Sequence, residues 1–149
     1  MNKGFTLLEM LIVLVITAVI CVGAITSLGR FRANTALDAA HQDTLTALHE
    51  ARELTLSSKE ATVYGVHFQT DKAVRFTGAT YDAGATSNVT YLFDPRVRAV
   101  SISLSDGVSD VVFKRLTGET NATGTIVVAV YGKDMLRATT TVSSSGIIQ

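Results

Sequence analysis

The sequence is poor in the residues that build covalently linked or metal-stabilised domains. It has 1 cysteine, 1 proline and no tryptophan in 149 residues. The lone Cys21 excludes an intramolecular disulfide, and 3 scattered histidines without a cysteine pair provide no zinc framework. One proline and 11 glycines exclude collagen-like and proline-rich chains. We therefore expect no metal and no cofactor.

The charges balance overall but are unevenly distributed. The 13 basic and 13 acidic residues give a net charge of zero, which disfavours a strongly basic nucleic-acid binder and an acidic tail. Residues 10–28 carry no charge at all, whereas the rest of the chain is polar and mixed in sign. This distribution predicts a membrane-tethered protein with one soluble domain.

The uncharged run has the length of a membrane span. Nineteen residues in a helix extend about 28 Å, close to the ~30 Å hydrocarbon core of a bilayer. The run is rich in β-branched residues, yet lipid favours a helix because backbone groups must be satisfied internally. A cleaved secretion signal has a shorter apolar core, and an ordinary signal anchor is the second alternative.

Glu9 stands at the start of this run and needs an explanation. A carboxylate at the edge of an apolar segment is costly unless a cation pairs with it. The sequence has no Lys or Arg between Gly4 and Leu28 to do so. A cut after Gly4 would create a free amine on Phe5, about 6 Å from Glu9 along one helix. In a staggered stack, Glu9 would instead reach the amine of a neighbouring chain, which indicates an assembly device.

Residues 3–9, Lys-Gly-Phe-Thr-Leu-Leu-Glu, followed by an apolar helix, resemble the class III signal of type IV pilins and type II secretion pseudopilins. The resemblance implies that a prepilin peptidase cuts after Gly4 and N-methylates Phe5, and that Glu9 is the assembly carboxylate. It implies a single-pass protein of the bacterial inner membrane, with a cytoplasmic N-terminus and an extracytoplasmic globular domain. The implied partners are the prepilin peptidase, other pilin or pseudopilin subunits, the inner-membrane assembly platform, and the membrane itself before assembly.

Two features favour a pseudopilin or minor pilin within this family. Thr26 stands where major pilins often carry a helix-kinking proline. The C-terminal half resembles, more loosely, the minor pseudopilin H type of type II secretion. The resembling features are the strand at residues 64–68, the stretch from 111 to a turn at Gly118, and the ending at 137–142 and 146–148. The absence of a C-terminal disulfide agrees with this type.

Residues 34–58 have helical periodicity. Apolar residues recur on one narrow face, and they are Leu37, Ala40, Leu45, Leu48, Ala51 and Leu54. Because no proline interrupts residues 5–58, we expect one continuous helix of about 50 residues. The cluster of Glu50, Arg52 and Glu53 is expected to form a solvated face.

After Lys59 the apolar period changes to two, which is typical of strands. Strands are expected at residues 62–68, 73–76, 89–93, 100–104, 111–116, 125–131 and 136–142, with a short terminal piece at 146–148. Without intervening helices these strands predict antiparallel sheets. The predicted fold is α+β, a long N-terminal helix packed on a small antiparallel β-sandwich. The expected parts are a leader (1–4), a transmembrane and assembly helix (5–29), an amphipathic extension (30–59) and a β-rich domain (60–149).

The sequence has little that suggests chemistry. It has no glycine-rich phosphate loop, no nucleophile elbow and no cysteine–histidine pair, so we expect no enzyme activity. His41 and His49 are eight residues apart, too far for chelation by adjacent helical turns.

DNA contact is a separate question. Beyond Ser58, nine basic residues oppose eight acidic ones, which is not the footprint of an electrostatic DNA binder. Arg96 and Arg98 would share one face of an extended stretch, with Lys114 and Arg115 as candidate neighbours. The alternatives to a pilus or pseudopilus subunit are a minor pilin of a DNA-uptake filament and a signal-anchored binding domain that does not polymerise.

Overall fold

The computed structural model describes residues 4–57, 61–105 and 107–149. Its first element is α1, a 50-residue helix spanning Leu7–Leu56. The chain divides into two compact units, residues 1–34 and residues 35–149, and α1 contributes to both. The helix passes through Gly23 and Gly29 without a break, as expected for a segment that contains no proline. The predicted continuous helix is confirmed, and its expected end at residue 59 lies outside the described residues.

Within the second unit, α1 buries a face of mostly small side chains. The buried residues are Ala36, Leu37, Ala40, Thr44, Ala47, Leu48, Ala51 and Thr55. The predicted apolar face was wrong for Leu45 and Leu54, which are only partly buried. Thr44 and Thr55 lie on the buried face because each hydroxyl donates to a carbonyl one turn earlier, over 2.9 Å and 2.8 Å. A buried hydroxyl that is paired in this way carries little desolvation penalty.

Seven strands follow the helix. They are β1 (Tyr64–Phe68), β2 (Lys72–Thr77), β3 (Val89–Leu92), β4 (Val97–Leu104), β5 (Asp110–Val112), β6 (Gly124–Val130) and β7 (Lys133–Val142). They form a four-stranded sheet in the order β3-β2-β1-β5 and a three-stranded sheet in the order β4-β6-β7. All pairings are antiparallel. The predicted α+β fold, a long helix packed on antiparallel sheets, is confirmed.

The predicted strands are all present, with bounds that differ by a few residues. β5 ends at Val112 rather than at residue 116, because Phe113 forms an isolated bridge with Thr120 and the chain turns at Leu116, where φ is 73°. β4 begins three residues earlier than expected and contains a bulge between Ala99 and Ser101. A bulge shifts the alternation of side chains, so the apolar pattern hides this start of the strand. The terminal piece is a single bridge between Val142 and Ile148.

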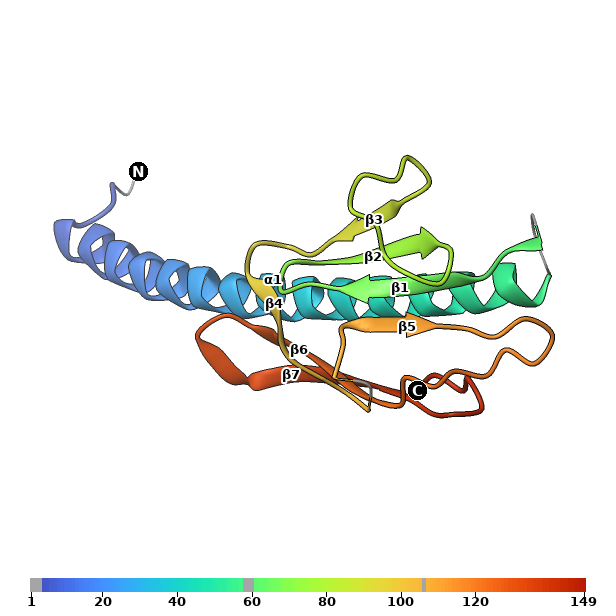
Figure 1. Ribbon diagram of the computed structural model, residues 1–149. Helices are drawn as coiled ribbons and strands as arrows, with labels where there is room; N and C mark the ends of the chain where they lie inside the picture. The colour runs from blue at the N-terminus through green and yellow to red at the C-terminus, as the bar shows by residue number, and fades with distance from the viewer. Residues whose placement is uncertain (1–3, 58–60, 106) are drawn as a thin grey trace. The chain divides into compact units, whose positions relative to one another are not determined.

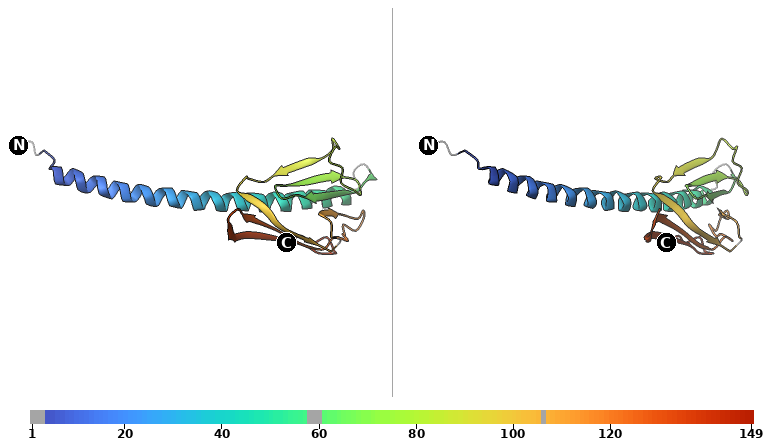
Figure 2. Two further views of the ribbon diagram at one scale, coloured as in Figure 1. Left: turned by 60° about the vertical axis from the view of Figure 1, so that its left-hand side comes forward. Right: turned by 90° about the vertical axis from the view of Figure 1, so that its left-hand side faces the viewer.

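Both sheets lie against the part of α1 that belongs to the second unit. Strands β1, β2 and β3 lie on one side of it, and β6 and β7 lie on the other (Figures 1 and 2). Thr55 near the end of α1 accepts a hydrogen bond of 2.9 Å from the backbone N–H of Tyr64, the first residue of β1. On the opposite side, His41 Nδ1 lies 3.2 Å from the hydroxyl of the buried Thr140 on β7.

A polar cluster joins α1 to β2 and β3. The Tyr91 hydroxyl on β3 donates to Glu50 Oε2 over 2.5 Å, and Arg75 Nε on β2 lies 3.3 Å from the same oxygen as an ion pair. Burial of the ring raises the pKa of Tyr91 above its ordinary value of 10.0, and the hydrogen bond to Glu50 raises it further. Of the residues expected to form a solvated face, Glu53 is exposed. Arg52, by contrast, donates to the Gly118 carbonyl over 3.4 Å.

Candidate functional site

The predicted cleavage and methylation residues lie directly before the first helix. Gly4 and Phe5 are exposed and non-helical, and α1 begins at Leu7. Thr6 caps the helix, since its hydroxyl accepts a hydrogen bond of 3.2 Å from the backbone N–H of Glu9. The carbonyl of Thr6 accepts a second bond of 3.2 Å from the N–H of Met10. The peptide bond between Gly4 and Phe5 therefore lies outside the helix, in exposed chain.

Glu9 occupies the first turn of α1 and is exposed. A threonine cap followed three residues later by glutamate is the capping-box pattern, and a carboxylate in this turn also interacts favourably with the helix dipole. The structure thus gives Glu9 a local role at the helix start, besides the predicted role in assembly. Met1, Asn2 and Lys3 of the predicted leader lie outside the described residues. Cleavage after Gly4, methylation of Phe5 and assembly through Glu9 stay predictions.

The helix that follows exposes its apolar side chains over most of its first half. Phe5 is 76% exposed, Leu7 is 84% exposed, and the large apolar residues from Leu8 to Val22 are all at least 49% exposed. The helix is long and apolar enough to cross a membrane, and none of the described side chains in its most apolar stretch is buried. A signal sequence near the N-terminus would meet the same criteria. An exposed apolar surface of this extent is compatible with a membrane-anchoring segment.

The comparison with protein families decides what kind of segment this is. Residues 1–25 match the family model of the prokaryotic N-terminal methylation motif. The chain therefore begins with a type IV pilin-like prepilin signal. Residues 26–149 lie outside the matched segment. Compared with curated proteins and with solved structures, the chain has no significant match in either set.

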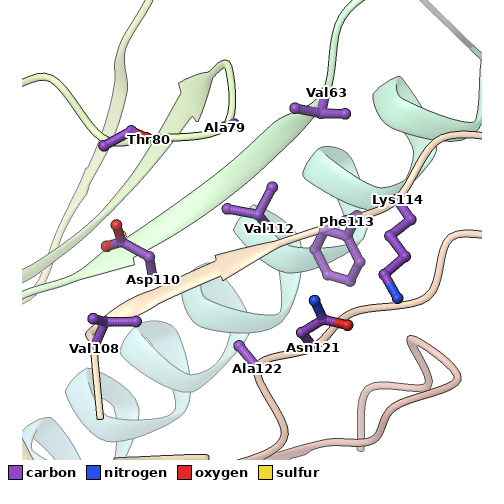
Figure 3. A pocket seen from close by; sticks show the side chains of 10 residues that line it. All are labelled: Val63, Ala79, Thr80, Val108, Asp110, Val112, Phe113, Lys114, Asn121 and Ala122. Carbon is purple, nitrogen blue, oxygen red and sulfur yellow. The ribbon is translucent and has the colours of Figure 1, made fainter. Parts of the chain in front are cut away.

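A pocket of about 440 Å³ lies in the second unit, on β5 and the loops around it (Figure 3). Val112 and Phe113 lie in its middle, and Asp110 and Lys114 lie toward its two ends. Asp110 is already paired, because its carboxylate forms a hydrogen bond with His67 Nδ1. The His67 ring stacks on Tyr81, with centroids 4.0 Å apart. These contacts hold the loop that carries Tyr81 against the four-stranded sheet, so they account for the His67–Asp110 pair structurally.

The cations singled out in the sequence do not form one cluster. Arg96 lies in a turn, with Nε 3.7 Å from Asp94 Oδ1. Arg98 is exposed on β4 of the three-stranded sheet. Arg115 lies three residues after β5 of the four-stranded sheet and donates to the Ala61 carbonyl over 3.0 Å. Among the described residues there is no group of three metal-ligating side chains. His49 is exposed.

Proposed function

We propose that this chain is a structural subunit of a type IV pilin-like filament. The observation that carries the proposal is the methylation motif at residues 1–25, continuous with an exposed apolar helix. A secretion signal that is cut away does not need a helix that runs on into the folded domain, as α1 does to Leu56. The helix serves as a membrane anchor in the precursor and as a filament core element after assembly.

Processing would follow from the arrangement at the N-terminus. A prepilin peptidase at the membrane hydrolyses the peptide bond after Gly4, and the new amine of Phe5 is methylated. Thr6 supports this step, because its cap starts the helix two residues beyond the bond that is cut. The globular unit then lies on the extracytoplasmic side of the inner membrane.

Assembly would use the charge of Glu9. An exposed carboxylate in the first turn is available to the Phe5 amine of a neighbouring subunit. In the low dielectric between packed apolar helices, an unpaired carboxylate is costly and a paired one is tolerated. The pair therefore favours the one stagger of subunits that brings each Glu9 to a neighbour's amine. The inner-membrane assembly platform would supply the subunits to the growing filament.

Within this class, the finer proposal is a minor pseudopilin of the H type in a type II secretion system. The proline-free helix and the single cysteine, which leaves no C-terminal disulfide, support it. We also propose that the role is mechanical rather than enzymatic. The His67–Asp110 pair supports this view, since its partners hold two strands and a loop together.

The processing step gives a direct test in cells. Wild-type chain expressed with an active prepilin peptidase is expected to run as a shorter band than the same chain expressed without it. The Gly4→Ala variant is expected to stay at precursor size in both cells. If wild-type chain is not shortened, the signal-anchored domain that does not polymerise becomes the better explanation.

A further inference from the structure

The hairpin of β6 and β7 exposes two large apolar side chains, Tyr131 in its turn and Met135 near the start of β7. Tyr131 is 69% exposed and Met135 is 96% exposed, so Met135 packs on almost nothing within the chain. The turn lies at the end of the second unit where that unit's part of α1 begins, as both figures show (Figures 1 and 2). Tyr131 and Met135 therefore contribute little to the hydrophobic core of the second unit.

Two arginines lie beside this hairpin on the outer face of the three-stranded sheet. Arg98 on β4 pairs with Ala129, and Ala129 pairs with Arg137 on β7, so all three lie on the same face. That face is the outer one, because Arg98 and Arg137 are exposed while Val97 and Ala99, on either side of Arg98, are buried. The Arg98 guanidinium also lies 4.5 Å from the centre of the Tyr131 ring. Among the residues whose side chains the structure describes, which do not include Lys133 and Asp134 of this hairpin, Arg98 and Arg137 form no ion pair, in contrast to Arg96.

We propose that Arg98, Arg137, Tyr131 and Met135, here called the turn patch, rest on the surface of a bilayer that contains anionic lipid. Tyrosine and methionine enter the boundary between headgroups and acyl chains, and arginine binds the lipid phosphates above them. Each cation near an anionic membrane surface adds to the attraction. The contact belongs to the subunit in the membrane before assembly, and it rests on the proposed membrane anchor.

The covalent link to the anchor makes a weak contact sufficient. The second unit begins at residue 35, seven residues after the uncharged run ends at Leu28. Arg30 and Arg32 lie in this short connection. A surface tethered this close to a bilayer has a high effective concentration there, so a patch too small to bind free in solution still engages. The contact would hold the domain in one orientation while the subunit waits for assembly.

The composition of the patch favours lipid over nucleic acid. A phosphate backbone would satisfy the two arginines, but it offers nothing to cover an aliphatic side chain such as Met135. Duplex binding also requires a broad basic surface, and the chain as a whole has no net charge. A bilayer supplies both the phosphates and an apolar layer next to them.

Because the sequence has no tryptophan, single tryptophans can report the depth of chosen sites. We would reconstitute the full chain in vesicles of phosphatidylcholine and phosphatidylglycerol, with and without bromine on the acyl chains. Met135→Trp reports the patch. Ile147→Trp is the matched control, since Ile147 is also exposed and follows Gly146, which lies near Arg52 toward the end of α1. Val15→Trp reports the anchor itself.

We expect Met135→Trp to emit at shorter wavelength than Ile147→Trp and to lose about half of its fluorescence to brominated lipid. Adding Arg98→Glu and Arg137→Glu should return it to the level of Ile147→Trp, and high salt should act in the same direction. Equal quenching of Met135→Trp and Ile147→Trp, with Val15→Trp strongly quenched, would overturn the patch proposal alone. An unquenched Val15→Trp would overturn the anchor and the patch together. A Met135→Trp signal that responds to duplex DNA but not to lipid would also overturn the proposal and assign the patch to nucleic acid.

Discussion

The backbone N–H of Glu9 donates a hydrogen bond of 3.2 Å to the hydroxyl of Thr6. The residue expected to drive assembly is thus also part of the cap that starts the helix. A substitution at Glu9 therefore changes two things, the charge that would pair with a neighbour and the favourable carboxylate in the first turn. These two effects can be separated by the choice of substitution.

Glu9→Ala and Glu9→Gln are expected to be processed normally but to be poorly incorporated into filaments. Glutamine keeps the capping-box pattern and removes the charge, so it isolates the electrostatic role. The measurement is the amount of subunit in the sheared filament fraction, relative to the membrane fraction. If Glu9→Gln assembles like wild type while Glu9→Ala does not, the carboxylate acts through the helix cap and the charge-pairing mechanism is wrong.

Thr55→Val should destabilise the second unit by about 1–3 kcal/mol, because valine fills the same space but leaves the buried N–H of Tyr64 without an acceptor. Thr55→Ser keeps the hydroxyl and should cost clearly less. Urea unfolding of the purified chain, followed by circular dichroism, measures both. Equal midpoints for the two variants would show that the hydrogen bond between α1 and β1 contributes little.

Gly65→Ala should also destabilise the fold. A Cβ at this position would lie 2.6 Å from Cζ of Phe76 and 2.9 Å from the carbonyl oxygen of Val111. The phenyl ring of Phe76 is buried and the carbonyl belongs to the neighbouring strand, so neither can move away freely. Overpacking of this kind costs about 1–3 kcal/mol. Gly84→Ala serves as a control, since its Cβ would meet only Asp82 Oδ1 at 3.5 Å.

The Tyr91–Glu50 hydrogen bond gives stability a defined pH dependence. The pKa of Tyr91 is raised in the folded chain, by burial first and by Glu50 second. The unfolded chain therefore loses this proton before the folded one does. The contribution is complete below about pH 10 and is lost as the pH rises from there through the raised value. Tyr91→Phe should be less stable than wild type by about 1 kcal/mol at neutral pH.

Above pH 10, the difference between wild type and Tyr91→Phe should shrink. Melting temperatures of both chains at a series of pH values test this directly. A difference that stays constant from pH 8 to pH 11 would mean that the tyrosine hydroxyl does not titrate as described.

The features that depend on a local sequence pattern could be predicted from the sequence. The contacts between residues far apart in the sequence could not. The uncharged run, the threonine and glutamate at the helix start and the alternating strands are all local patterns. The cluster of Glu50, Arg75 and Tyr91 depends on strand register and on the rotation of the helix, which a local pattern does not contain. Arg98 and Arg137 come together for the same reason, on strands that each pair with β6.

The buried face of α1 illustrates a different limit. Thr44 and Thr55 look polar in the sequence, yet both are buried because each hydroxyl has a partner within the helix. Leu45 and Leu54 look like core residues but lie at the margins of the face. Hydrophobicity alone therefore does not place the edges of the buried helix face, because small side chains with paired hydroxyls allow closer packing than leucine.

The central claim concerns the N-terminus, and the most direct test is mass spectrometry of the intact chain and its N-terminal peptide from the native membrane. We predict a mature chain that begins at Phe5, lighter than the precursor by the residues up to Gly4 and heavier by one methyl group on the new amine. A chain that still begins at Met1, in cells with an active prepilin peptidase, would contradict the account.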